Sequence, residues 1–111
     1  MSAPDPSLFT PSAVAMAEKL GLTKGRANLE TFAATLEELA KANPNIIAVT
    51  SDSRGSGKLT SFGNALPKQL VEVGIAEQNL VGITAGLAAC GKKPFGVSPS
   101  CFLTARSLEQ I

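Results

Sequence analysis

Five consecutive residues at positions 46 to 50, IIAVT, are apolar or β-branched, without alternation of polar and apolar side chains. A strand with one face in solvent alternates, so an unbroken run indicates a strand that is buried on both faces. An amphipathic helix is predicted just before it, from about residue 28 to 42, and the sequence NPN ends that helix. This arrangement favours a parallel sheet that is covered by helices.

Two further pairs of strand and helix are predicted after this run. QLVEVG at 69 to 74 has the pattern of a second strand, and AEQNLVGITAGLAAC at 76 to 90 that of a helix. KPFGVS at 93 to 98 predicts a third strand, and FLTARSLEQI at 102 to 111 begins a third helix. The serine- and glycine-rich segment SDSRGSGKLTSFG at 51 to 63 is predicted to be a loop. The order of elements predicts an α/β fold, a parallel sheet with flanking helices.

The two ends of the sequence differ in character. Pro4, Pro6 and Pro11 predict a flexible tail over residues 1 to 11, followed by a short helix over AVAMAEKL that Ser12 caps. At the other end, nothing in the last helix stops it, and three strands are few for a covered sheet. We therefore expect an incomplete domain, truncated at its C-terminus; the alternative is a small complete domain with a frayed end.

The composition excludes several classes of function. The formal net charge is +1, which predicts no binding to nucleic acid or to a membrane surface. The chain has no histidine, so no metal site is expected within it and no catalytic pair that uses histidine. The only cysteines, Cys90 and Cys101, are predicted to be reduced core thiols of a cytoplasmic protein.

Three segments leave the predicted strand ends: SDSRGSGK, GIAEQN and SPSCF. In parallel sheets such segments meet at the carboxyl edge, so Asp52, Glu77 and Phe102 form a candidate constellation. Glu77 lies between two segments that both look buried. Its carboxylate either complements the dipole of the following helix or exchanges a proton with a ligand.

Two other features leave alternatives open. The loop SDSRGSGK is either a flexible surface loop or an anion-binding nest, and it matches neither a Walker A loop nor a Rossmann fingerprint. The helix after Glu77 carries small residues that pack either against the sheet or against a second subunit: Gly82, Ala85, Gly86, Ala88 and Ala89.

The stretches IIAVTSDSRGSGKL, LVEVGIAEQNLVGITAGLAACGKKPF and CFLTARSLEQI together resemble the pyrimidine-binding domain of the transketolase family. The resemblance covers residues 25 to 111 and implies the N-terminal portion of that domain, with the thiamine diphosphate-binding fold. Residues 1 to 24 lie outside it as an N-terminal extension. GIAEQN followed by GxxAGLA is the most specific signal.

The resemblance implies roles for five residues. Glu77 corresponds to the family's catalytic glutamate, which binds N1′ of the aminopyrimidine ring of thiamine diphosphate. Phe102 corresponds to an aromatic residue against that ring, with a core phenylalanine as the alternative, and Asp52 to an aspartate near the cofactor. Ser56 and Arg26 correspond to residues that hold a sugar phosphate; for Arg26 the alternative is an exposed linker arginine.

The sequence also departs from the family pattern. Pro99 replaces a residue of the family's STF stretch, and Ala105 stands where a further aromatic is common, so the pocket is expected to differ in shape. The chain has no GDG motif, which in this family helps to bind diphosphate and magnesium. The resemblance therefore implies a diphosphate-binding partner subunit or domain that holds Mg²⁺, within a homo- or hetero-oligomer.

The function that the resemblance implies is transfer of a two-carbon ketol unit between sugar phosphates by a transketolase-like transferase, inactive without its partner. The alternatives are a 1-deoxyxylulose-5-phosphate synthase-like subunit, a 2-oxo acid dehydrogenase β-like subunit, and a non-catalytic interaction domain of the same fold. The residues do not identify the donor and acceptor sugars.

Overall fold

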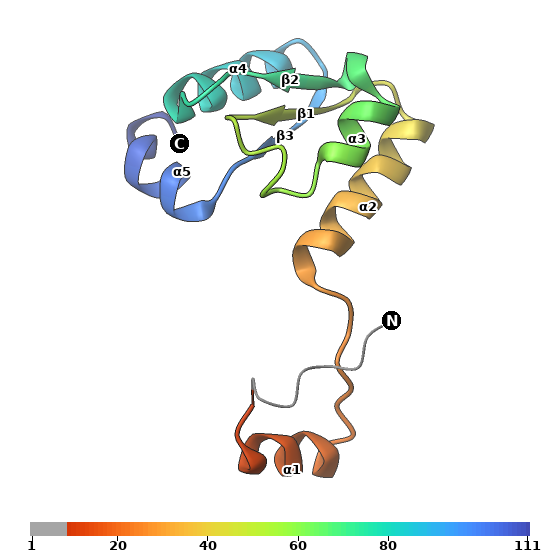
Figure 1. Cartoon of the computed structure of the whole chain (residues 1–111). Coiled ribbons are helices and arrows are strands. Elements are labelled where there is room, and N and C mark those ends of the chain that lie inside the picture. Colours follow the sequence, from red (N-terminus) through yellow and green to blue (C-terminus); the bar gives the residue numbers. More distant parts are fainter. Residues whose placement is uncertain (1–8) are drawn as a thin grey trace.

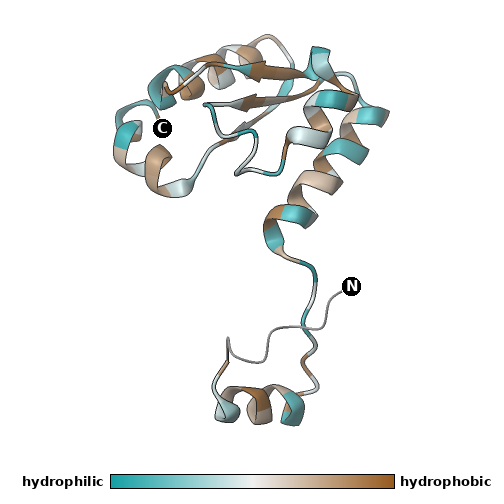
Figure 2. Cartoon of the chain, viewed as in Figure 1, coloured by the Kyte–Doolittle hydropathy of each residue, from teal (hydrophilic) through white to brown (hydrophobic). Residues whose placement is uncertain are grey.

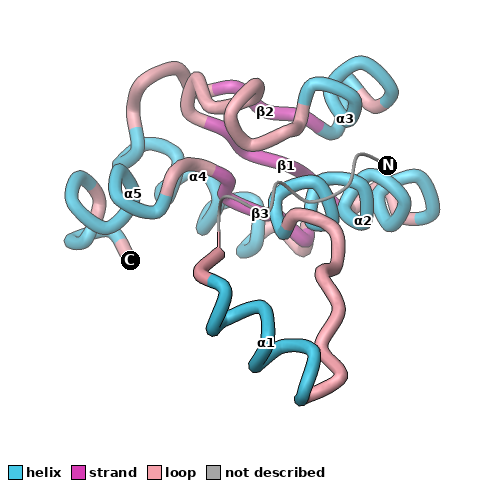
Figure 3. The backbone as a smooth tube through the Cα atoms, turned by 60° about the horizontal axis from the view of Figure 1, so that its bottom comes forward, coloured by secondary structure: helices cyan, strands magenta, loops and turns pink. Residues whose placement is uncertain are grey.

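The computed structural model describes residues 9–111, and its centre is a three-stranded parallel sheet (Figure 1). The strands are β1 (Ile46–Thr50), β2 (Leu70–Glu72) and β3 (Lys93–Val97). Their order is β2-β1-β3, which Figure 3 shows from another side. Thr50 at the end of β1 is in register with Glu72 of β2 and Val97 of β3. The predicted α/β class with a parallel sheet and flanking helices is confirmed.

The central strand is buried on both faces, as its unbroken apolar pattern predicts. On one face Ile46 and Ala48 pack with residues of α2 (Asn28–Ala42) and α3 (Thr60–Ala65). On the other face Ile47 and Val49 pack with Leu80 of α4 (Glu77–Ala89) and Leu103 of α5 (Ser100–Arg106). Figure 1 shows α2 and α3 on one side of the sheet and α4 on the other, and in Figure 2 the strands between them are largely hydrophobic.

The prediction of a loop throughout 51–63 is wrong, because α3 begins at Thr60. This helix has six residues and no side chain that caps its start, so the local sequence gives little indication that a helix forms here. Its formation depends on long-range packing: Leu59 and Phe62 have relative exposures of 0% and 1% and lie against α2 and β1. A short 3-10 helix, η2 (Pro67–Gln69), then leads into β2.

The C-terminal helix is shorter than predicted. α5 ends at Arg106, and Ser107 is fully buried with its hydroxyl donating to the carbonyl of Leu103 at 2.6 Å. A 3-10 helix, η3 (Leu108–Gln110), follows. The prediction of core thiols is also wrong, because Cys90 and Cys101 are both exposed. Cys90 follows the last turn of α4, and Cys101 lies in the first turn of α5.

Helix α2 uses only part of its predicted apolar face. Ala33, Leu36 and Ala40 are buried, whereas Leu29, Phe32 and Leu39 stay exposed. The small sheet does not extend beneath the whole helix. The ring centroid of Phe32 lies 6.5 Å from that of Phe95 in β3.

Helix α1 (Pro11–Lys19) lies apart from the sheet in Figure 1 and has no buried residue. Its cap is Thr10, whose hydroxyl accepts from the amide of Ala13 at 3.3 Å, so the prediction of Ser12 as the cap is wrong. Pro11 begins the helix instead of blocking it, because a proline at the first helical position loses no hydrogen bond. Residues 1–8 of the predicted tail lie outside the described residues.

Across residues 9–111, no helix is long and apolar enough to cross a membrane.

Candidate active site

Glu77 is the first residue of α4, and a short turn separates it from Glu72, the last residue of β2. The amide of Val73 still donates to the carbonyl of Thr50, at 2.9 Å, and Gly74 then adopts a φ of +72° that favours glycine. This turn redirects the chain from the sheet edge into the helix. It leaves the Glu77 side chain only 5% exposed. A carboxyl group is therefore almost completely shielded from solvent at the carboxyl end of the sheet.

The two segments beside Glu77 are less buried than the sequence predicts. β2 is an edge strand, with Leu70 and Val71 half-buried and Glu72 exposed. In α4 only Glu77 and Leu80 are buried. The burial of Glu77 is therefore local, and it depends on what covers this one position.

The residue that pairs with Glu77 is Arg106, the last residue of α5, which the sequence analysis missed. Its Nη1 donates to Oε1 of Glu77 at 2.9 Å. Its guanidinium carbon also lies 4.3 Å from the centroid of the Phe102 ring, one helical turn earlier. The four-residue spacing of Phe102 and Arg106 could have indicated their contact, but no local signal links Arg106 to a glutamate 29 residues away.

Phe102 is 39% exposed, so the alternative of a core phenylalanine does not describe it. An open hollow of about 340 Å³ beside Glu77 is lined by Ile75, Ala76, Glu77, Gln78, Asn79 and Arg106, but not by Phe102. In Figure 1 the start of α4 and the whole of α5 lie close together at the carboxyl end of the sheet. The site thus has a buried carboxylate and a guanidinium at one hollow, with an exposed aromatic ring on the other side of that guanidinium.

Asp52 follows the central strand and is linked to the Glu77 turn through the backbone. Its φ of +52° is uncommon for a residue other than glycine, though aspartate tolerates it. The amide of Asp52 donates to Oε1 of Glu72 at 2.7 Å, and the amide of Gly74 donates to the same oxygen at 2.9 Å. The Glu72 carboxylate therefore joins the loop after β1 to the turn before Glu77.

Replacing Glu72 with alanine should loosen both loops, because two charge-assisted hydrogen bonds are lost. We expect a loss of about 1–3 kcal/mol in the free energy of unfolding and faster hydrogen exchange at the amides of Asp52 and Gly74. Glu72→Gln keeps an acceptor oxygen and should protect both amides better than Glu72→Ala. Equal exchange rates in the wild type and the alanine variant would show that the bridge is unimportant.

A cluster of serine hydroxyls holds the remaining part of the β1 loop. Ser51 donates to Oγ of Ser98 at 2.8 Å, and Ser53 donates to the carbonyl of Ser51 at 3.0 Å. The hydroxyl of Ser56 donates to the carbonyl of Ser53 at 3.2 Å, and Ser56 itself is exposed. The cluster ties the loop to the end of β3 and leaves Ser56 on the solvent side.

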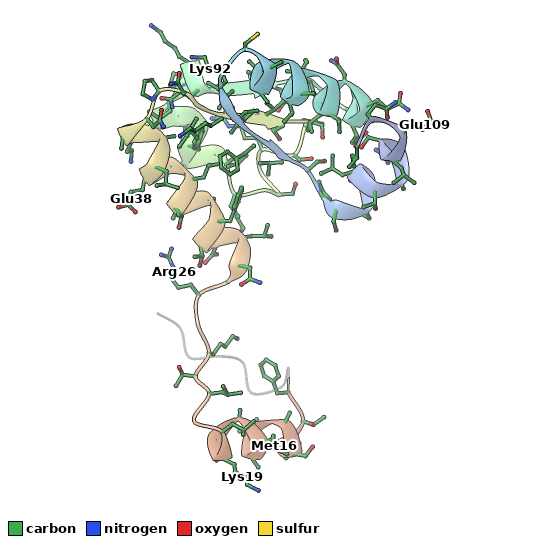
Figure 4. All side chains as sticks on the ribbon, turned by 180° about the vertical axis from the view of Figure 1, so that it is seen from behind. Met16, Lys19, Arg26, Glu38, Lys92 and Glu109 are labelled. Atoms are coloured by element: carbon green, nitrogen blue, oxygen red, sulfur yellow. The ribbon has the colours of Figure 1, made fainter. Side chains whose placement is uncertain are left out.

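Arg26 lies in the exposed linker just before α2. Figure 4 labels it there, away from Glu109, which follows α5. It lines a separate hollow of about 260 Å³ together with Lys58 and Ser61, but not with Ser56. Glu30 and Glu37 line the same hollow. A hydrogen bond from Lys41, with a second from Ser61, holds the pKa of Glu37 below its usual value, so this carboxylate stays charged beside the basic groups.

The structure thus brings some predicted residues together and separates others. Glu77 and Phe102 are joined through Arg106. Asp52 lies at the same carboxyl end of the sheet, where Glu72 links it to the turn before Glu77. The hollow that Arg26 lines does not include Ser56. A buried carboxylate beside an exposed aromatic ring can meet a heteroaromatic ligand, through a ring nitrogen and through stacking.

Comparison with known proteins connects this geometry to a family. Residues 24–111 match the family model described as "Transketolase, pyrimidine binding domain". The chain belongs to the transketolase pyrimidine-binding domain family. The resemblance stated from the motifs is therefore confirmed, and the segment that carries Asp52, Glu77 and Phe102 falls within the matched region.

Individual relatives of this pyrimidine-binding domain are similar over most of the chain. A subunit of the apulose-4-phosphate transketolase of Phocaeicola vulgatus is 56% identical over 82 residues, which are 74% of this chain and 26% of that protein. A 1-deoxy-D-xylulose-5-phosphate synthase of Synechocystis is 44% identical over 82 residues, 74% of this chain and 13% of that protein.

A solved structure gives the same result for the fold. The protein described as "Split gene transketolase, inactive beta4 tetramer" has a TM-score of 0.68 and 39% sequence identity, over 77% of this chain and 28% of that one. The chain thus spans about a quarter of the length of the Phocaeicola relative and of this structure.

Proposed function

We propose that this chain is the pyrimidine-binding part of a thiamine diphosphate-dependent transketolase, with Glu77 as its catalytic residue. The observation that supports the proposal most directly is the position of Glu77. It is a carboxylate with 5% exposure, at the junction of β2 and α4, beside a hollow and within the GIAEQN segment of a pyrimidine-binding domain. A purely structural glutamate at a helix start gains its dipole interaction while exposed and needs no such burial.

The Glu77 carboxyl group and the Phe102 ring fit the aminopyrimidine end of thiamine diphosphate. Glu77 can share a proton with a ring nitrogen through a carboxylate oxygen, and the exposed ring of Phe102 can stack against a flat heterocycle. When bound, the cofactor supplies a carbon nucleophile and stores electrons while a carbon–carbon bond of the substrate breaks. The part of Glu77 is to hold one proton at a carboxylate oxygen, in a position from which most water is excluded.

The other predicted residues receive supporting roles. Asp52 stands near the cofactor, at the carboxyl end of the central strand, with its loop held by Glu72. Ser56 and Arg26 bind the phosphate of the substrate. Ser56 is exposed on the loop after β1, and Arg26 lies beside Lys58 in the second hollow.

We infer that the active protein is an oligomer with a diphosphate-binding partner subunit or domain that holds Mg²⁺. The Phocaeicola relative is named as one subunit of a transketolase, and this name and the split-gene description of the solved structure support the inference. The small residues of α4 support it too. Gly82 and Gly86 have no atom near enough to contact an added Cβ, so the alternative of tight packing against the sheet does not hold at these two positions.

The proposed reaction is transfer of a two-carbon ketol unit from a ketose phosphate, in the cytoplasm. The relative with 56% identity carries the name of a sugar phosphate transketolase, which supports this class of substrate. A 1-deoxyxylulose-5-phosphate synthase-like activity is the second candidate, because the Synechocystis synthase is 44% identical to the chain over 82 residues.

Reconstitution tests the proposal. The full chain is mixed with a diphosphate-binding transketolase subunit, thiamine diphosphate and Mg²⁺, and ketol transfer from a ketose phosphate to an aldehyde acceptor is measured. We expect transfer only when both chains and the cofactor are present. Release of CO₂ from a 2-oxo acid donor, without ketol transfer, would favour the synthase-like or dehydrogenase-like alternative. Absence of both reactions and of cofactor binding would favour the non-catalytic domain.

A further inference from the structure

The side chain of Arg54 joins the loop after β1 to α3, a contact that the proposed function does not use. Its Nη2 donates to the carbonyl of Thr60 at 3.2 Å and to Oδ1 of Asn64 at 2.6 Å. Both acceptors belong to α3 and both are neutral, so the contact depends on geometry and not on ion pairing. Arg54 is half-buried. A long side chain thus attaches a loop at the carboxyl end of the sheet to a helix.

Gly63 of α3 provides the space in which this guanidinium lies. A Cβ added at Gly63 would be 2.6 Å from Cζ, 2.7 Å from Nη2 and 2.8 Å from Nε of Arg54, which is closer than real Cβ contacts come. The Nε atom is buried and has no hydrogen-bond partner among the described residues. Glycine weakens a helix relative to alanine, and the guanidinium gives a physical reason for a glycine in this short helix.

The part of the loop that Arg54 holds carries Ser56. Residues 54–59 form a compact turn, which is closed by a hydrogen bond from the amide of Leu59 to the carbonyl of Arg54 at 2.8 Å. Arg54 therefore bonds the end of the turn through its backbone and α3 through its side chain. Ser56 lies in the middle of the turn and is exposed, with its hydroxyl 3.2 Å from the carbonyl of Ser53. The direction of this hydroxyl depends on how the turn is held against α3.

We propose that Arg54 is a positioning residue for substrate binding: over Gly63 it fixes the turn so that the hydroxyl of Ser56 meets the phosphate of the substrate. This inference rests on the proposed role of Ser56 in phosphate binding. It assigns Arg54 no contact with the substrate. The effect of Arg54 should therefore pass through Ser56 and be confined to substrates that carry a phosphate.

The test compares two donors in the complex of the full chain with a diphosphate-binding subunit, thiamine diphosphate and Mg²⁺. One donor is a ketose phosphate, and the other is the same ketose without its phosphate. Arg54→Met removes both hydrogen bonds and keeps an apolar stem. We expect KM for the ketose phosphate to rise by about 5- to 30-fold with kcat unchanged, because a hydrogen bond to a charged group is weakened in the ground state and the transition state alike. KM for the unphosphorylated ketose should stay the same.

Gly63→Ala breaks the same contact without changing the charge. The added Cβ displaces the guanidinium, which is the end of a flexible side chain, and alanine favours the helix. We expect the same rise in KM for the ketose phosphate, and this variant replaces Arg54→Met if that protein does not fold. The double variant should bind the donor no more weakly than either single variant, since both changes remove one contact. Lys68→Met, which removes an exposed charge on η2, is the matched control and should leave both KM values unchanged.

A further comparison uses Ser56→Ala, in which Arg54→Met should cause no additional rise in KM. A rise that persists in that background would overturn the inference, because Arg54 would then act on the phosphate without Ser56. Equal changes for both donors, or no change for the ketose phosphate, would overturn it as well, since they indicate a purely structural contact or none that matters. Failure of the proposed function has a different signature: the wild type transfers a ketol unit from neither donor, or Ser56→Ala leaves KM for the ketose phosphate unchanged.

Discussion

Replacing Glu77 with alanine should slow exchange of the C2 proton of bound thiamine diphosphate by about 100- to 10,000-fold, the usual range for loss of a positioned acid–base group. The physical reason is that position 77 lies in a nearly dry turn, so water cannot take over the role of the missing carboxylate. The measurement is hydrogen–deuterium exchange followed by NMR, in the complex of the chain with a diphosphate-binding subunit.

A matched control for this variant is Glu38→Ala. Glu38 is exposed on the outer side of α2, where Figure 4 labels it, and its replacement should leave the exchange rate unchanged. Cofactor binding must be checked in both variants, since Glu77→Ala also leaves Arg106 without its partner. If Glu77→Ala binds the cofactor and exchanges the C2 proton at the wild-type rate, Glu77 is not the catalytic residue.

The largest effect on stability is expected from Phe62→Ala. The Phe62 ring is 1% exposed and is the largest fully buried side chain of the described residues. It fills the space between α2, α3 and β1, within the cluster that includes Leu36, Ala48 and Leu59. Deleting a buried phenylalanine side chain removes its burial free energy and leaves a cavity, at a cost of about 3–5 kcal/mol. Urea denaturation of the full chain, followed by circular dichroism, measures this loss.

Phe9→Ala is the matched control, because Phe9 is 53% exposed and precedes α1, outside both core clusters. Its replacement should change the free energy of unfolding by less than about 0.5 kcal/mol. Since α3 exists mainly through packing, we also expect Phe62→Ala to remove the slow amide exchange of residues 60–65 first. A small effect of Phe62→Ala would mean that α3 is held by something other than this ring.

The regular part of the fold could be predicted from local patterns. The β1 run IIAVT, the helical spacing in α2 and the turn around Gly74 each act over a few residues, and the structure has an element at each of them. The order of these elements was enough to predict a parallel sheet. Three stretches together, with GIAEQN followed by GxxAGLA as the most specific part, were enough to predict the family, which the match over residues 24–111 confirms.

The predictions that were wrong concern features that depend on distant residues. α3 has six residues and no cap, and it forms because Leu59 and Phe62 reach the core under α2. The cysteines are exposed because the outer surfaces of α4 and α5 are uncovered in this chain. α5 ends at Arg106, and the hydroxyl of the buried Ser107 that follows donates to the carbonyl of Leu103.

The sequence by itself determined the class of fold, the family and the position of Glu77 at the end of a strand, because periodicity and motifs are local properties of the chain. Only the tertiary structure decided what surrounds that carboxylate. Arg106 follows β3 and Glu77 follows β2, on opposite edges of the sheet, and α4 and α5 bring them to 2.9 Å. A contact between residues 29 apart depends on how the helices pack, which no local pattern encodes.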